Sequence, residues 1–280
     1  MLQYSDVMEK INYNFYENRT SLENKGHSYS YQVLHQMRNK TKLTTPHGKL
    51  IGVSVGPGDA ELLTLKAVRI IQKASLIAYT VNGKGYSYAR EIIKDYIQEG
   101  SEELALHFSM SEDGDVRKAA RKEVAQQVLS RLHAGQDVVY IVEGDALIYS
   151  TFIHILEEMT PEIEIEICPG VSSFNAAAAA TQLPLDQQIA LIPAYDIKYD
   201  IIEERLNSFN TIAFYKVHAC MSKVLFALEA TERLDQAMLI EYASGKVERI
   251  RPISQYSLKE QLPYFSIVLV VHDKEDLDTW

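Results

Sequence analysis

The segment that decides the fold is LIGVSVGPGDAELLTL, residues 50–65. Its first half is a short apolar run with β-branched residues, which is typical of a buried parallel strand. Asp59 suits the N-cap of a following helix, and Glu61 places a negative charge in its first turn. Apolar residues then recur at helical spacing from Leu63 to Ala74. Loops at the carboxyl ends of parallel strands bind ligands in open α/β sheets, so we expect residues 56–59 to face a pocket.

The glycines of this loop do not match the common phosphate-binding motifs. A phosphate loop would continue with Gly-Lys-Ser or Gly-Lys-Thr, whereas Asp59 and Ala60 follow here. A dinucleotide fingerprint would have a third glycine where Glu61 stands. A carboxylate at the helix start also occupies the place that attracts an anion. The loop therefore predicts a ligand without a diphosphate, or only a tight turn with a cap.

The composition is that of an ordinary globular protein, with 280 residues, 46% hydrophobic and 24% charged. A net charge of −10 argues against general nucleic-acid binding, which needs a basic surface. The two cysteines, Cys168 and Cys220, have no metal-binding spacing, and the scattered histidines have none either. No apolar run is long enough to span a membrane, and the start lacks a signal-peptide pattern. We expect a cytoplasmic protein without a metal site.

Strand and helix patterns alternate from Lys49 onward, which predicts a mostly parallel sheet in an α/β fold. We expect three parts: an N-terminal extension (1–48), a first α/β domain (49–159) and a second one (160–280). The extension is rich in Tyr, Asn and Ser and suggests short helices at 4–16 and 31–37. The first domain should contain strands at 50–55, 76–79, 104–108 and 138–142. The second should contain strands at 163–167, 189–192, 211–215, 237–242 and 265–271, with a hairpin turn at 244–246.

Three loop motifs occur in order along the chain: GPGD at 56–59, EGDALIYS at 143–150 and PGVSS at 169–173. Together they resemble the hallmark loops of the tetrapyrrole methylases, the S-adenosylmethionine-dependent enzymes of corrin and sirohaem synthesis. Within that family, the chain resembles the precorrin-2 (cobalt-factor II) C20-methyltransferases. The closer likeness rests on NGKG (82–85), QLPL (182–185), LIPA (191–194), YKV (215–217) and PYFS (263–266). The resemblance extends from Lys49 to about Asp273 and leaves out the N-terminal extension.

The resemblance implies two α/β/α domains with a ligand cleft between them, and a homodimer. It implies S-adenosylmethionine as the cofactor and a methyl transfer to C20 of precorrin-2 or cobalt-factor II, with any cobalt belonging to the substrate. The cofactor residues that it implies are Pro57, Gly144, Asp145, Ile148, Ser172, Ser173, Lys216 and Ala243. The family loop usually has proline where Ala146 stands, which predicts a less rigid loop here. Alternatives are another tetrapyrrole or diphthine methylase, or a catalytically silent relative with a binding role.

The acidic protein must still bind a substrate that is fringed with carboxylates. Because distant charges are screened within about 8 Å at physiological salt, a local group of cations is required. We expect Lys84, Lys216 and His218 to bind the substrate; other candidates are Arg90, Arg117, Lys118 and Arg121. The methyl transfer itself needs mainly positioning and desolvation. The catalytic residues stay unknown at this point, with Asp145, Tyr149 and His218 as alternatives for a base.

Overall fold

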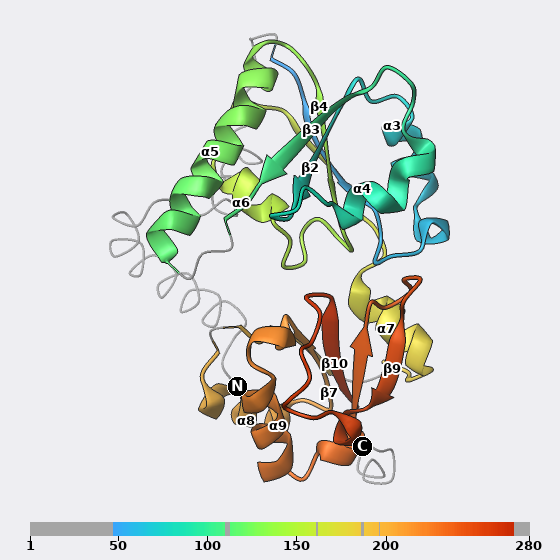
Figure 1. Cartoon of the computed structure of the whole chain (residues 1–280), viewed down its shortest axis with the longest axis vertical. Coiled ribbons are helices and arrows are strands. Elements are labelled where there is room, and N and C mark those ends of the chain that lie inside the picture. Colours follow the sequence, from blue (N-terminus) through green and yellow to red (C-terminus); the bar gives the residue numbers. More distant parts are fainter. Residues whose placement is uncertain (1–46, 110–112, 161, 186–187, 196, 272–280) are drawn as a thin grey trace, which may run out of the picture.

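The computed structural model describes residues 47–109, 113–160, 162–185, 188–195 and 197–271. Within these ranges the chain forms two α/β domains, one above the other in Figure 1. The expected short helices of the N-terminal extension lie outside the described residues. Among the described helices, none is both long and apolar enough to cross a bilayer.

The first sheet is entirely parallel, with the order β3-β2-β4-β1-β5. Helices cover both of its faces, which buries every strand of the sheet centre and explains their continuous apolar sequences. Val138, Tyr140 and Val142 of β4 point toward α5 and α6, while Val139 and Ile141 point toward α3 and α4. The elements are β1 (Leu50–Ser54), α3 (Leu65–Ile71), β2 (Leu76–Val81), α4 (Tyr88–Ile93), β3 (Glu102–His107), α5 (Gly114–His133), β4 (Val138–Val142), α6 (Phe152–Glu157) and β5 (Ile165–Cys168).

The second sheet has the order β6-β7-β10-β8-β9 and is mixed. Only β6 and β7 run parallel, because β10 inserts antiparallel between β7 and β8, and the short turn after β8 returns the chain antiparallel as β9. Helix α7 covers one face, and α8 and α9 cover the other. The elements are α7 (Ser173–Thr181), β6 (Ile189–Pro193), α8 (Tyr199–Ser208), β7 (Thr211–Tyr215), α9 (Met221–Ala230), β8 (Ala237–Glu241), β9 (Arg249–Pro252) and β10 (Ser266–Val271).

The expected α/β class agrees with the structure, but two details differ. The second sheet is mostly antiparallel rather than mostly parallel. In addition, β5 was expected to open the second domain at residue 160, whereas it pairs in parallel with β1 and completes the first sheet. An alternating Ile/Glu pattern describes a half-exposed edge strand equally well in either sheet, so the pattern could not decide between them.

The helix expected directly after Asp59 also begins later. Asp59 accepts a hydrogen bond from the Glu61 amide, but it caps only a short 3-10 turn, Ala60–Leu62. The α-helix α3 starts at Leu65, where the Thr64 hydroxyl accepts from the Ala67 amide. Two successive caps therefore lie between the loop and the helix.

Candidate active site

Three loops meet at the carboxyl ends of β4, β1 and β5, which are neighbours in the first sheet. Gly56 and Gly144 exchange two backbone hydrogen bonds, Gly144 N to Gly56 O at 2.8 Å and Gly56 N to Gly144 O at 3.3 Å. Both glycines have positive φ values, 77° and 66°, which side chains rarely adopt. At Gly170, a Cβ atom would lie only 2.6 Å from Ser54 Cβ. Glycine is thus required where the loops approach one another most closely.

Asp145 holds two of these loops together through its carboxylate. Its Oδ2 accepts a hydrogen bond from the Gly170 amide at 3.0 Å, and its Oδ1 accepts from the Leu147 amide at 2.9 Å. The next residue, Ala146, is fully buried and donates its amide hydrogen to Ser54 Oγ at 2.9 Å. Proline could not donate that bond. The loss of rigidity expected from Ala146 is therefore offset by a hydrogen bond that ties the loop to β1.

These loops form one wall of a pocket whose other wall comes from the second sheet. The pocket encloses about 870 Å³ of empty space, including the solvent at its open mouth. All eight residues expected to hold the cofactor line it: Pro57, Gly144, Asp145, Ile148, Ser172, Ser173, Lys216 and Ala243. The other lining residues are Glu143, Tyr149, Ser150, Thr151, Tyr215, Ile240, Tyr264, Phe265, Ser266 and Ile267.

Backbone strain is concentrated around this pocket. Lys216, directly after β7, adopts a left-handed conformation with φ of 58°. Ala243 lies between two further left-handed residues, Tyr242 and Ser244, with φ of 50° and 60°. Tyr149 has φ of 52°. Such conformations cost about 1–3 kcal/mol each and persist where the surrounding structure enforces them, often at ligand sites.

One buried hydroxyl in the pocket has no hydrogen-bond partner in the described part of the chain. Tyr215 is 8% exposed, lines the pocket, and its phenol oxygen makes no hydrogen bond to any described residue. Burial raises its pKa to about 12, so it is a neutral donor. An unsatisfied buried hydroxyl costs about 1–3 kcal/mol, which a polar ligand would recover. Together with Ser172 and Ser173, Tyr215 gives the pocket a polar lining without a phosphate-binding motif. Such a lining fits S-adenosylmethionine, which carries no phosphate.

The expected substrate-binding residues lie at different distances from the pocket. Lys216 lines it, with Nζ 5.1 Å from the centre of the Tyr195 ring. His218 does not line the pocket and packs against Tyr264, with ring centres 5.2 Å apart and the rings tilted by 55°. Lys84 is exposed in the loop after β2 and does not line the pocket. Of the three, only Lys216 reaches the cavity directly.

Two of the arginines considered with them have distinct environments. Arg90 forms a two-pronged pair with Glu103, with Nε–Oε2 and Nη2–Oε1 distances of 2.8 and 2.9 Å, which excludes it as a free cation. Burial lowers the pKa of Lys216, and the charge of the nearby Arg121 in α5 lowers it further. In Figure 1, α5 begins at its end nearest the second domain. These two cations therefore come together from opposite domains.

Of the three candidate bases, Asp145 and Tyr149 already form hydrogen bonds within the protein, and His218 lies outside the pocket lining. Both oxygens of Asp145 accept backbone hydrogen bonds, and Tyr149 donates its hydroxyl to the Leu191 carbonyl at 2.5 Å. His218 does not line the pocket, and burial followed by the Lys216 charge lowers its pKa. The sequence motifs contained Glu143 and Tyr264 but gave them no role. Both line the pocket, and only their position after β4 and before β10 could have suggested this.

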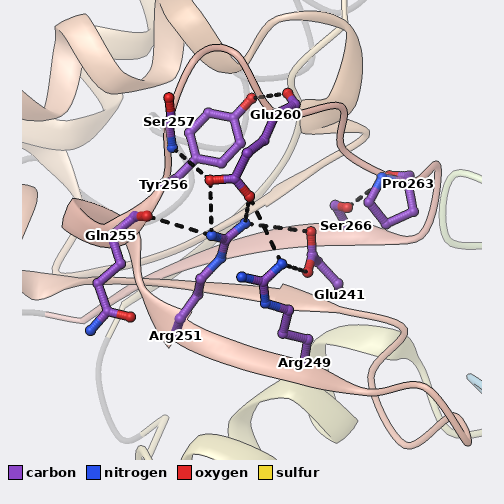
Figure 2. Close-up of polar contacts among 9 residues, drawn as sticks. All are labelled: Glu241, Arg249, Arg251, Gln255, Tyr256, Ser257, Glu260, Pro263 and Ser266. Carbon is purple, nitrogen blue, oxygen red and sulfur yellow. Dashed lines mark hydrogen bonds and ion pairs between the residues drawn. The ribbon is translucent and has the colours of Figure 1, made fainter.

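An arginine–glutamate network supports the second wall. Arg251 of β9 binds Glu260 through two hydrogen bonds of 2.8 and 3.2 Å and also lies 3.8 Å from Glu241. Figure 2 shows Arg251 and Arg249 pointing toward these two carboxylates. The network holds Glu260, which lies between β9 and β10 in the segment that leads to the pocket residues Tyr264, Phe265 and Ser266. In the described part of the chain, no group of three or more His, Cys, Asp or Glu residues is arranged to hold a metal ion.

Comparison with known proteins accounts for this architecture. Residues 49–258 match the family described as Tetrapyrrole (Corrin/Porphyrin) Methylases. The cobalt-precorrin-2 C(20)-methyltransferase of Salmonella typhimurium is 32% identical over 80% of this chain and 96% of its own length. The precorrin-2 C(20)-methyltransferase of a Sinorhizobium species is 29% identical over 80% of this chain and 95% of its own.

A solved structure shares the fold as well. The uroporphyrin-III C-methyltransferase of Thermus thermophilus, determined with S-adenosyl homocysteine, has a TM-score of 0.61 and 19% identity over 80% of this chain and 97% of that one. The family match covers most of the chain, and the loops, the two sheets and the pocket between them are all present. The chain belongs to the tetrapyrrole (corrin/porphyrin) methylases.

Proposed function

We propose that this protein is an S-adenosylmethionine-dependent C-methyltransferase that acts on C20 of precorrin-2 or cobalt-factor II in cobalamin biosynthesis. The observation that carries the proposal is the pocket between the sheets, lined by residues of both. Relatives that carry the C20-methyltransferase name cover 80% of the chain at about 30% identity. Methyltransferases of this family use S-adenosylmethionine.

The cofactor would be held by the three tied loops of the first domain and by residues 215–216 and 243 of the second. When bound, it supplies an activated methyl group on a sulfonium centre. Pro57 and Gly144 would offer backbone contacts without bulk, while Ser172, Ser173 and Tyr215 would offer hydroxyls. The apolar members of the lining, Ile148, Ile240 and Ile267 among them, exclude water from the reacting groups.

The protein's own contribution to transfer would be positioning. The ties between Gly56, Gly144 and Asp145 fix the loops before any ligand arrives, so little ordering is left for binding to supply. Lys216 and Arg121, from opposite domains, would pair with carboxylates at the edge of the tetrapyrrole. The exposed Lys84 would contact only a part of the substrate that protrudes from the pocket.

A turnover assay with metal-free and cobalt-containing precorrin-2 tests the proposal. The expected result is a product heavier by one methyl group, with one S-adenosylhomocysteine released per turnover and the new methyl at C20 by carbon NMR. Methylation at another ring carbon, or of diphthine precursors only, would support another member of the superfamily. Binding of the cofactor without any turnover would support a catalytically silent relative.

Assembly and location form part of the same proposal. We expect a cytoplasmic homodimer, and light scattering at micromolar concentration tests the dimer. We also propose that the first domain runs from residue 49 through β5 and that the second begins at the loop before α7, because β5 pairs with β1. The N-terminal extension, 1–48, forms a third part, and removal of residues 1–45 should leave methyl transfer measurable.

A further inference from the structure

Glu143 is the carboxylate in the pocket whose role remains unassigned. It follows β4 directly, in the central region of the first sheet, and lines the cavity. Its Oε1 accepts a hydrogen bond of 3.1 Å from the Ala89 amide in α4, which orients the side chain. Among the described residues, no lysine, arginine or histidine forms an ion pair with it.

The groups that surround Glu143 are phenols rather than cations. Tyr140 lies on β4, Tyr86 and Tyr88 lie at the start of α4, and Tyr264 precedes β10; the negative charge of Glu143 acts on all four. Burial raises the pKa of Glu143. Backbone hydrogen bonds lower it by less, so the net shift is upward. A partly buried acid without a cationic partner is unfavourable for folding, and such groups concentrate at functional sites.

The other polar groups of the cavity do not compete for protons. Asp145 has both oxygens occupied by backbone amides, and Tyr149 donates its hydroxyl to a carbonyl. Burial raises the pKa of Tyr215 to about 12, so it is protonated near neutrality. Lys216 lies as a cation over the Tyr195 ring. Among the described residues that line the pocket, Glu143 is therefore the one left to accept a proton.

We propose that Glu143 is the catalytic base that removes the proton from the newly methylated carbon of the tetrapyrrole. The inference rests on the proposed function. A carbon that already bears hydrogen becomes four-substituted when it gains a methyl group, and the conjugated system is left with one positive charge. The C–H bond then breaks, its electron pair returns to the conjugated system, and the proton passes to the Glu143 carboxylate and on to solvent. Before that step, the negative charge stabilises the cationic ring.

The geometry suits this role in two respects. The Ala89 hydrogen bond holds one oxygen, so the carboxylate is oriented before the substrate binds. The raised pKa makes Glu143 a stronger base than an exposed carboxylate, closer to the value that is efficient near neutrality. A sulfonium cation in the same pocket would lower that pKa again and keep the carboxylate ionised until transfer has occurred.

The test compares Glu143→Gln and Glu143→Asp with the wild-type protein. Gln keeps an acceptor for the Ala89 amide but cannot take a proton, so kcat should fall by between about 10² and 10⁴-fold. Asp keeps the carboxylate and should retain more activity than Gln. The matched control is Glu164→Gln, which removes the same charge from an exposed position paired with Lys49. That control should leave kcat unchanged.

Three readouts separate catalysis from a structural role. Calorimetry should show S-adenosylhomocysteine binding to Glu143→Gln within about twofold of wild type, because the proposed role is not in binding. The kcat of the wild-type protein should fall as acid protonates Glu143, and this acid limb should be missing in Glu143→Gln. Substrate deuterated at C20 should show a primary isotope effect in Glu143→Gln.

Each outcome leads to a decision. If the wild-type protein transfers no methyl group to precorrin-2, the proposed function fails independently of Glu143. If the wild type is active and Glu143→Gln keeps its activity or its acid limb, Glu143 is not the base. Loss of S-adenosylhomocysteine binding in Glu143→Gln would also overturn the inference, because it would show that the side chain holds the cofactor. Low activity with intact binding and no acid limb supports it.

Discussion

A buried acid of the second sheet and a partly buried acid of the first have opposite surroundings. On the second sheet, Glu241 is only 7% exposed, but Arg251 and Arg249 lie on one side of it and Glu260 shares both arginines (Figure 2). On the first sheet, Glu143 is surrounded by phenols and has no described cationic partner. Charges that hold a protein together are usually compensated, whereas charges that act on a ligand are left available. The contrast indicates which acid supports the fold and which one serves the site.

Breaking the compensated network should have the largest effect. Replacing Arg251 by Met leaves the buried Glu241 with only the exposed Arg249 as a partner, so we expect a loss of about 3 kcal/mol in the free energy of unfolding. Arg249 is 58% exposed and lies 3.8 Å from both carboxylates, so Arg249→Met should cost less than about 1 kcal/mol. Urea denaturation of both variants measures the difference. Equal losses would show that the burial of Arg251 does not govern the network.

Asp145, two residues from Glu143, provides a comparison within one loop. Its carboxylate accepts from the Gly170 and Leu147 amides. In Asp145→Asn, one of these amides would face an NH₂ group, and the charge that strengthens both bonds would be lost. We expect a loss of about 2 kcal/mol in stability and weaker S-adenosylhomocysteine binding, measured by denaturation and calorimetry. Unchanged stability would mean that these bonds do not tie the loops.

Lys216 is the second unpaired charge of the pocket and tests substrate recognition. Lys216→Met should raise the Michaelis constant for the tetrapyrrole about tenfold, the effect of losing one charge-assisted hydrogen bond. Lys84→Met serves as the control, because its exposed side chain lies outside the pocket and should change the constant by less than about twofold. Added salt should weaken wild-type binding more than that of Lys216→Met. If neither variant changes binding, recognition rests on backbone groups.

The smallest expected effect has the opposite sign. Because the pKa of Glu143 in the folded protein is raised above its ordinary value of 4.5, wild-type stability falls as pH rises from that value through the folded pKa. Glu143→Gln lacks this loss and should be more stable than wild type by about 1 kcal/mol at neutral pH. Below pH 4.5 the gain should disappear. Thermal unfolding at several pH values measures it; a destabilised variant at neutral pH would contradict the unpaired environment.

Local sequence was sufficient for much of the fold. The apolar run before Gly56 predicted β1, and the motifs at 143–150 and 169–173 predicted the loops that meet it. Six of the eight expected cofactor residues lie on loops that follow neighbouring parallel strands of the first sheet, so these loops must lie together. Lys216 and Ala243 follow strands of the second sheet and reach the same pocket only because the two domains pack together. The assignment of roles to those residues stays a prediction.

Long-range packing decided what the motifs could not. Val116 has the helical spacing of Val124, Val128 and Leu132, which α5 buries, yet Val116 is 47% exposed. Lys84 and Lys216 both follow strands of their sheets, but only Lys216 faces the other domain. Long-range packing also decided the place of β5: its alternating sequence fitted either sheet, and it pairs with β1 of the first.

The sequence by itself determined the family loops, the strands and the ligand class, because these depend on residues that are close together along the chain. The tertiary structure decided which acid is compensated. Arg251 and Glu260 are nine residues apart and meet through a local turn, while Glu143 lies among tyrosines drawn from three separate segments. Whether a charge is paired depends on which groups folding brings around it, and no local pattern records that.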